Sequence, residues 1–293
     1  MLEAVLQNLV FGILLGALYG LAAVGIALVF GVTKFLNVAH GELLMLGGYA
    51  CYWMFNLVGF DPFASLPLTI IFLLLIGVVL YQLVFVRMIK LPTEEKIKNT
   101  MLVGFGLSLI LSNTALLLWT ADDRGITTPY SSEVFILWGI RFPYVRVAGL
   151  VISLISLFLL DQFLKRTYTG KAIRATVQNW EAASLMGIDV RKVYLLSFLL
   201  GSALAGVAGA LVAVSFSVDP SMGMHWTLKS LIVFVLGGVG NFMGTFFGGI
   251  LLGATESVTG FFISSNYRQV IGLVLFLLIL IFRPQGLFGV KER

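Results

Sequence analysis

Charged residues are scarce in this chain of 293 residues, since Asp, Glu, Lys and Arg make up 11% of it, against about 25% in soluble domains. Hydrophobic residues make up 59%, and the mean hydropathy is +1.02. The polar residues are too few to form the surface of a water-soluble globular protein. The apolar residues must therefore face lipid. The apolar runs are long and continuous rather than alternating, which favours helices over a barrel. We therefore predict an all-α polytopic transmembrane bundle, one domain over residues 1–293.

Residue types that carry chemistry are equally scarce. The single cysteine, Cys51, cannot form an internal disulfide, and the two histidines, His40 and His225, lie in no H-E-x-x-H motif. The G-x-x-x-x-G-K-[ST] phosphate loop is missing, because Gly170-Lys171 lacks both the upstream glycine and the following Ser or Thr. The sequence therefore predicts no enzyme, no catalytic or metal-binding residue and no cofactor site. The net charge of +5 comes from basic residues in short loops, which indicates membrane topology and not nucleic-acid binding.

Eight apolar stretches are long enough to cross a bilayer as full helical spans. A ninth stretch, 229–240, is too short to do so as a regular helix, and we expect a broken or re-entrant segment there. The eight spans are predicted at about 6–30, 38–58, 66–86, 100–119, 144–164, 193–216, 244–263 and 267–283.

The distribution of basic residues predicts an orientation. If Lys34, the loops 87–98 and 165–192 and the C-terminal tail share one side, that side holds 14 of the 19 Lys and Arg residues. An excess of Lys and Arg marks the cytoplasmic side. The N-terminus is then outside and the C-terminus inside, provided that 229–240 crosses the membrane. The remaining basic residues, Arg124, Arg141, Arg146, Lys229 and Arg268, are assigned to the outside.

Small residues recur at the four-residue spacing of close helix packing. Gly12, Gly16 and Gly20 form one row in the first span, and Gly249 and Gly253 belong to another in a late span. Such rows let backbones approach closely in lipid. We expect them to pack helices within this chain; an interface between subunits is the alternative.

Polar side chains inside the apolar stretches are candidates for a translocation path, because an ionisable group at membrane depth usually faces the bundle interior or a water-filled path. At the start of the second span, a helix-start role near the cytoplasmic face is the competing interpretation, with an asparagine as cap and a glutamate in the first turn. The candidates are Asn37, His40 and Glu42 in the second span, Asn113 and Thr114 in the fourth, and Glu256 in the late span 244–263.

The basic loop 165–192 contains signals for a short helix outside the membrane. Asn179 is a good N-cap, Glu181 lies in the first turn, and Gly187 is a good stop. The sequence predicts a two-turn helix over 179–187. The small side chains of Ala182 and Ala183 leave room for another protein surface, with a helix lying in the lipid headgroups as the alternative.

The segment Glu181-Ala182-Ala183-Ser184-Leu185-Met186-Gly187 is similar to the E-A-A-x-x-x-G loop by which importer permeases dock onto their ATPases, although no Ile-x-Leu-Pro follows. Other segments resemble permeases of the branched-chain amino acid ABC importer family, in the same order along the chain. These are 37–42 with 47–49, the glycine-rich stretch from 237 to Glu256, 267–268, and 282–289.

This resemblance implies a transport subunit in the bacterial inner membrane. Its expected partners are two ATPase subunits that bind the ATP, a second related permease or a copy of itself, an extracytoplasmic solute-binding protein and membrane lipid. The substrate would be a branched-chain or other amino acid, or a small amide. Asn179, Glu181, Ala182, Ala183 and Gly187 would couple the chain to the ATPases. A secondary transporter or channel, and an integral membrane enzyme, are the competing classes.

Overall fold

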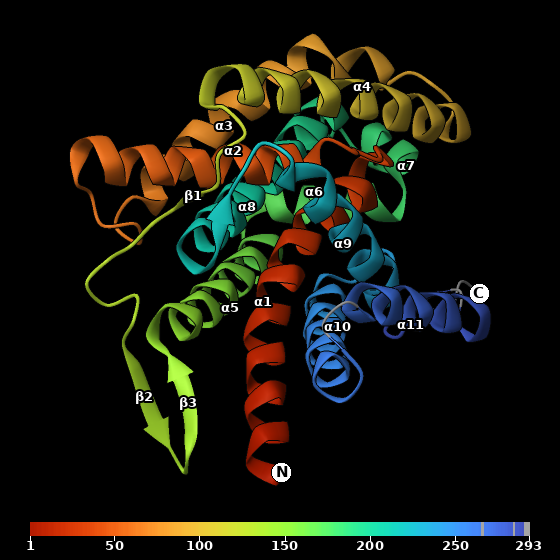
Figure 1. Ribbon diagram of the computed structural model, residues 1–293. Helices are drawn as coiled ribbons and strands as arrows, with labels where there is room; N and C mark the ends of the chain where they lie inside the picture. Colours follow the sequence, from red (N-terminus) through yellow and green to blue (C-terminus); the bar gives the residue numbers. More distant parts are fainter. Residues whose placement is uncertain (265–266, 284, 290–293) are drawn as a thin grey trace.

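The computed structural model describes residues 1–264, 267–283 and 285–289 and is almost entirely helical (Figure 1). The longer helices are α1 (Leu2–Thr33), α3 (Leu66–Leu83), α4 (Thr93–Trp119), α5 (Tyr144–Arg166), α8 (Val190–Ser215) and α10 (Phe242–Phe262). The shorter ones are α2 (His40–Trp53), α6 (Tyr168–Gln178), α7 (Trp180–Leu185), α9 (Met222–Gly237) and α11 (Arg268–Phe282), with a π-helical turn at Met54–Val58 and a 3₁₀ turn at Phe85–Met88. Four short strands complete the fold: β1 (Arg124–Gly125), β2 (Val134–Leu137), β3 (Ile140–Pro143) and β4 (Ser217–Val218).

Five of the described helices are long and apolar enough to cross a membrane: α1, α3, α4, α5 and α8. A sixth span results if α9 and α10, which meet at an angle of 117°, count together. The all-α polytopic prediction is confirmed, whereas eight full spans are not. The predicted short segment 229–240 is mostly the second half of α9, which begins earlier, at Met222.

Helix α1 runs through the middle of the bundle, and α3 and α4 lie across the top of the view (Figure 1). Most residues of α1 and α8 are buried within the chain, whereas most residues of α3, α4 and α5 are only partly buried or exposed. These exposed surfaces carry Leu, Ile and Phe side chains, as lipid-facing surfaces do.

Helices α1 and α10 cross at backbone contact. A methyl group added to Gly12 would stand 2.6 Å from the carbonyl oxygen of Gly253, and one added to Gly20 would stand 2.7 Å from that of Phe246. A real Cβ atom never comes this close, so only glycine fits. The small-residue rows thus pack helices within the chain, as predicted.

Helix α2 begins inside the bundle, because the preceding segment 34–39 turns back along α1. Its first residue, His40, places its Nε2 3.0 Å from the carbonyl oxygen of Ala22. Ala22 lies 11 residues before Thr33, the end of α1, which is roughly 16 Å along a helix. The predicted start of this span near the cytoplasmic face is therefore wrong. The predicted spans leave a gap at this point, but the sequence does not show that the non-helical segment, which includes Lys34 and Asn37, is mostly buried.

Two opposite ends of the bundle can be distinguished. At one end, Phe35 after α1 stacks on Phe85 and meets Tyr194 at the start of α8. The last described segment, 285–289, lies at this end too, because the backbone N–H of Leu287 donates to Leu236 of α9 (2.8 Å). Lys34 and the basic loops 87–98 and 165–192 belong to this end, as predicted; Lys291 and Arg293 of the tail lie outside the described residues.

The opposite end carries the strands. β1 pairs antiparallel with β4, and β2 pairs antiparallel with β3 in a hairpin beside the N-terminal part of α1 (Figure 1). The side chain of Gln7 in α1 fixes this hairpin by bonding both backbone groups of Arg141, at 2.8 Å each. Trp138 and Gly139 form the turn, both with positive φ, and Trp138 is 90% exposed.

Candidate functional site

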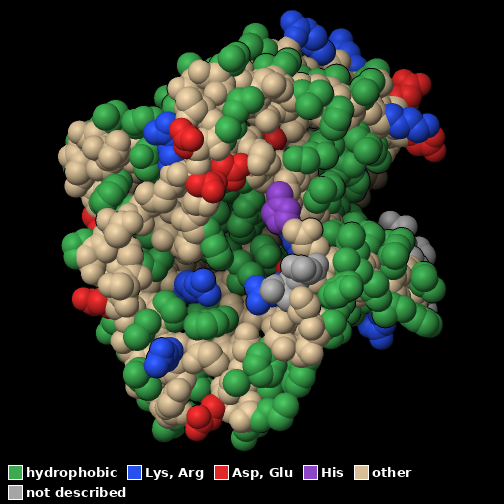
Figure 2. All heavy atoms as spheres, viewed as in Figure 1, with side chains coloured by type: hydrophobic (Ala, Val, Ile, Leu, Met, Phe, Trp, Pro, Cys, Tyr) green, Lys and Arg blue, Asp and Glu red, His purple; other side chains and the backbone are tan. Residues whose placement is uncertain are grey.

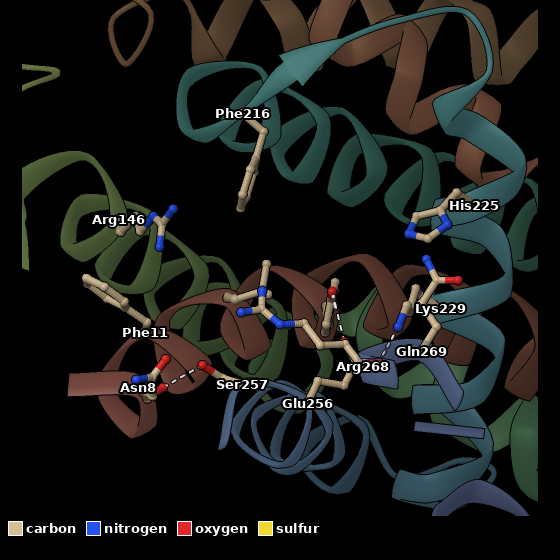
Figure 3. Close-up of a pocket in the computed structure, with 12 residues that line it drawn as sticks. Asn8, Phe11, Arg146, Phe216, His225, Lys229, Glu256, Ser257, Arg268 and Gln269 are labelled. Atoms are coloured by element: carbon tan, nitrogen blue, oxygen red, sulfur yellow. Dashed lines mark hydrogen bonds and ion pairs between the residues drawn. The ribbon is translucent and has the colours of Figure 1, made fainter. Parts of the chain in front are cut away.

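A polar cavity of about 610 Å³ lies between α1, α5, α9, α10 and α11. The face of the molecule that contains it is hollowed near its centre, with basic side chains below the hollow, a histidine beside it and acidic side chains above it (Figure 2). Twelve residues from six parts of the chain line it (Figure 3): Asn8, Phe11, Leu15, Tyr19, Arg146, Phe216, His225, Lys229, Glu256, Ser257, Arg268 and Gln269.

A buried ion pair forms the innermost polar part of this cavity. The Lys229 ammonium of α9 contacts the Oε1 atom of Glu256 in α10, and both side chains are at least 90% buried. The Tyr19 hydroxyl of α1 donates to the other carboxylate oxygen at 3.3 Å. Burying a charge is costly unless it is paired and hydrogen-bonded, and this arrangement satisfies both carboxylate oxygens. Three helices are thereby joined at one carboxylate.

Two arginines lie nearer the mouth of the cavity. The guanidinium carbon of Arg146 in α5 lies 5.2 Å from the ring centre of Phe11 and 5.4 Å from that of Phe216. Figure 3 shows the guanidinium groups of Arg146 and Arg268 facing the cavity. His225 of α9 is exposed and lines the cavity as well.

Among the predicted path residues, only Glu256 reaches this cavity. Asn113 and Thr114 are exposed on the outer surface of α4, where each bonds the carbonyl oxygen four residues earlier, at 2.7 Å. The structure therefore does not bring these two residues together with Glu256.

Asn37, His40 and Glu42 form a separate buried group around the start of α2. The Asn37 side chain accepts a hydrogen bond from the backbone N–H of Ala39 at 3.1 Å, and Ala39 precedes the first residue of α2. No side chain caps α2, so the prediction that Asn37 caps this helix is wrong. Ser108 of α4 donates to one Glu42 oxygen at 2.8 Å, whereas the other oxygen has no hydrogen-bond partner. A methyl group on Gly223 would overlap the Glu42 carboxyl, so α9 is in contact with this group.

The helix predicted in the basic loop exists as α7, but it has six residues where two turns were expected over 179–187. The Asn179 side chain accepts from the backbone N–H of Ala182 at 2.9 Å, Glu181 lies in the first turn, and Gly187 has φ +85°. These local signals are confirmed because each acts within one turn of the backbone.

The surface that α7 presents differs from the prediction. Ala183 is buried against the chain's own helices, whereas Ala182 is exposed. The open surface also carries the large apolar side chains of Trp180, Leu185 and Met186, which are 52–88% exposed. Asp189 follows and caps α8, because its carboxylate accepts a hydrogen bond from the backbone N–H of Lys192 at 3.2 Å. This hydrogen bond holds the pKa of Asp189 below its usual value. Helices α6 and α8 contact one side of α7, so of the two alanines expected to leave room for another protein only Ala182 is open.

Three charged cavity residues, Arg146, Lys229 and Arg268, were not predicted there, because the distribution of basic residues only assigned them to the outer side. Lys229 carries a readable signal, because it lies inside the apolar run of α9, where an unpaired cation would be costly. Nothing in the local sequence of Arg146 or Arg268 indicates a cavity. Across the described ranges, no three His, Cys, Asp or Glu side chains lie close enough to hold a metal ion.

Comparison with known proteins covers nearly the whole chain. Residues 8–282 match the family described as branched-chain amino acid transport system, permease component. The chain is 28% identical to the high-affinity branched-chain amino acid transport system permease protein BraD of Pseudomonas aeruginosa, over 98% of this chain and 96% of that protein. The corresponding LivH protein of Escherichia coli is 26% identical over the same shares. A probable branched-chain amino acid transport permease protein LivM of Methanocaldococcus jannaschii is 25% identical over 96% of this chain and 85% of that protein.

Proposed function

Because the chain belongs to the branched-chain amino acid transport permease family of ABC importers, we propose that it forms part of the path by which an amino acid crosses the membrane. The observation that carries this proposal is the polar cavity. It brings Lys229 and Glu256 together among otherwise apolar helices, and charged groups at membrane depth mark transport pathways more often than structural sites. Its volume of about 610 Å³ is that of a small-molecule site.

The energy for transport would come from separate ATPase subunits. The sequence has no G-x-x-x-x-G-K-[ST] loop, so ATP would bind to the partners. We assign the coupling contact to α7, with Asn179 and Gly187 fixing its ends and Ala182 at the contact surface. The exposed Trp180, Leu185 and Met186 support this assignment, because aromatic residues and methionine are enriched at the cores of protein interfaces.

The remaining partners follow from the architecture of ABC importers. A second permease, either related or identical, would complete the membrane-embedded part, and the similarity to a LivM protein supports a related one. An extracytoplasmic solute-binding protein would deliver the substrate at the end that carries the β2–β3 hairpin. The basic loops then lie in the cytoplasm, with the N-terminus outside and the C-terminus inside.

Reconstitution tests this function directly. The permease, its ATPase subunits and its solute-binding protein are placed in liposomes, and uptake of labelled leucine, isoleucine, valine and urea is measured. ATP-dependent uptake of an amino acid supports the proposal, and competition between substrates defines the range. Uptake driven by an ion gradient without ATP would instead establish a secondary transporter.

A further inference from the structure

The charges that line the cavity do not balance. Arg146, Lys229 and Arg268 are cationic, and Glu256 is the one carboxylate that lines the cavity in the described part of the chain. Lys229 is already paired with Glu256. Two arginines remain, and within the described residues neither has a carboxylate at salt-bridge distance.

No oxygen of the described residues accepts a hydrogen bond from the Arg146 guanidinium group. The rings of Phe11 and Phe216 stabilise its charge but offer no oxygen to its N–H groups. A guanidinium group carries five donors in a planar fork that fits a carboxylate through two parallel bonds. Arg268 enters the same cavity from α11, on the opposite wall (Figure 3).

On this basis we propose that Arg146 and Arg268 form the binding site for the α-carboxylate of the transported amino acid. This inference rests on the proposed function and adds the group of the substrate that the permease recognises. A single carboxylate suits the site better than a doubly charged anion, because the Glu256 carboxylate lines the same cavity. Phe11, Leu15 and Phe216 provide an apolar wall for a branched side chain.

The ammonium group of the substrate contributes less in this arrangement. Both oxygens of Glu256 already accept, one from Lys229 and one from the Tyr19 hydroxyl. A ligand that keeps the carboxylate and lacks the amine should therefore bind better than one that keeps the amine and lacks the carboxylate. Leucine, 4-methylpentanoate and 3-methylbutylamine form such a series, because all three keep the isobutyl side chain of leucine.

The test measures equilibrium binding of these three compounds to the permease–ATPase complex in phosphatidylcholine nanodiscs, without the solute-binding protein. Wild-type protein should bind 4-methylpentanoate at least tenfold more tightly than 3-methylbutylamine. Arg146→Gln and Arg268→Gln should each weaken leucine and 4-methylpentanoate binding at least tenfold and leave amine binding unchanged. Arg141→Gln is the matched control, because Arg141 is exposed on β3 outside the cavity and should bind all three like wild type.

The inference is overturned if wild-type protein does not bind 4-methylpentanoate, or if both variants bind it like wild type. A lipid headgroup is the other possible anion; in that case the variants would lose co-purifying phosphatidylglycerol and retain carboxylate binding. Failure of ATP-driven uptake by wild-type protein would refute the proposed function alone, because the arginine-dependent preference is measured without ATP. Normal uptake with no such preference would refute only the arginine site.

Discussion

Gly16 of α1 lies against Gly249 of α10 so closely that a methyl group on Gly16 would stand 2.6 Å from the Gly249 carbonyl oxygen. The obstacle is backbone and cannot rotate away. Tyr19 on α1 and Glu256 on α10 meet through the same crossing, so the glycine contact also sets the geometry of the cavity.

Gly16→Val should therefore prevent the native packing of α1 on α10. Overpacking commonly costs about 1–3 kcal/mol and more where backbone must move, so we expect little folded protein after detergent extraction. Gly106→Val in α4 is the control, because nothing lies within 4 Å of a side chain added there. Size-exclusion profiles and thermal unfolding in detergent compare the two. Equal stability of both variants would contradict the packing argument.

The Lys229–Glu256 pair should respond to mutation as a buried ion pair. Glu256→Gln and Lys229→Met each leave one buried charge without a partner, and each should destabilise the protein by about 3–5 kcal/mol and abolish transport. Combining Lys229→Met with Glu256→Leu removes both charges and should restore most of the stability without restoring transport. Thermal unfolding and ATP-driven uptake separate the two effects. If the double variant transports like wild type, the pair serves packing alone.

The position of α7 leads to opposite results at two neighbouring alanines. Ala182→Trp adds a large side chain to the exposed surface, so the permease should fold while ATPase co-purification falls roughly five- to a hundredfold, as expected for overpacking of about 1–3 kcal/mol. Ala183→Trp overpacks the chain's own interior and should reduce folding itself. Ser132→Trp, exposed at the other end of the bundle, should change neither. Wild-type ATPase association and uptake by Ala182→Trp would exclude α7 as the docking helix.

The hairpin turn provides a test of contact with the solute-binding protein. Trp138→Asn keeps a residue that tolerates positive φ and removes the exposed indole. A central aromatic contact is worth about 2 kcal/mol or more, so stimulation of ATPase activity by the loaded binding protein should need roughly thirtyfold more of that protein. Trp138→Phe carries the same backbone strain and should retain most of the response. Unchanged stimulation of Trp138→Asn would place the contact elsewhere, with Asp122 and Asp123 as the next residues to reverse.

The sequence predicts those features whose cause is local. Hydropathy identifies a helical membrane protein, and the Asn179 and Gly187 signals locate α7 to within a few residues. Spacing alone identifies the glycine rows, because a backbone contact needs no particular partner side chain. The cavity depends instead on α5, α9, α10 and α11 meeting, which no local pattern encodes. Arg146 and Arg268 therefore look like ordinary residues at span ends until the helices are assembled.

The segment between the first two spans has the same limitation. The predicted spans end at about 30 and begin again at about 38, so the break in the helix is expected from the sequence. Hydropathy does not show that the segment 34–39 stays mostly buried inside the bundle. Its backbone is satisfied by hydroxyl groups of distant helices: Thr100 in α4 accepts from Leu36, and Thr227 in α9 donates to Val38.

These hydroxyl groups impose an order on biogenesis. When 34–39 leaves the ribosome, Thr100 and Thr227 have not yet been synthesised, and lipid offers its backbone no replacement partners. The segment can obtain its full set of hydrogen bonds only after Thr227 of α9 is present, about 190 residues later. The amino-terminal third of the protein thus remains unfinished until almost the whole chain has been translated, and a nascent chain truncated before residue 227 leaves the entry to α2 without its closing hydrogen bonds.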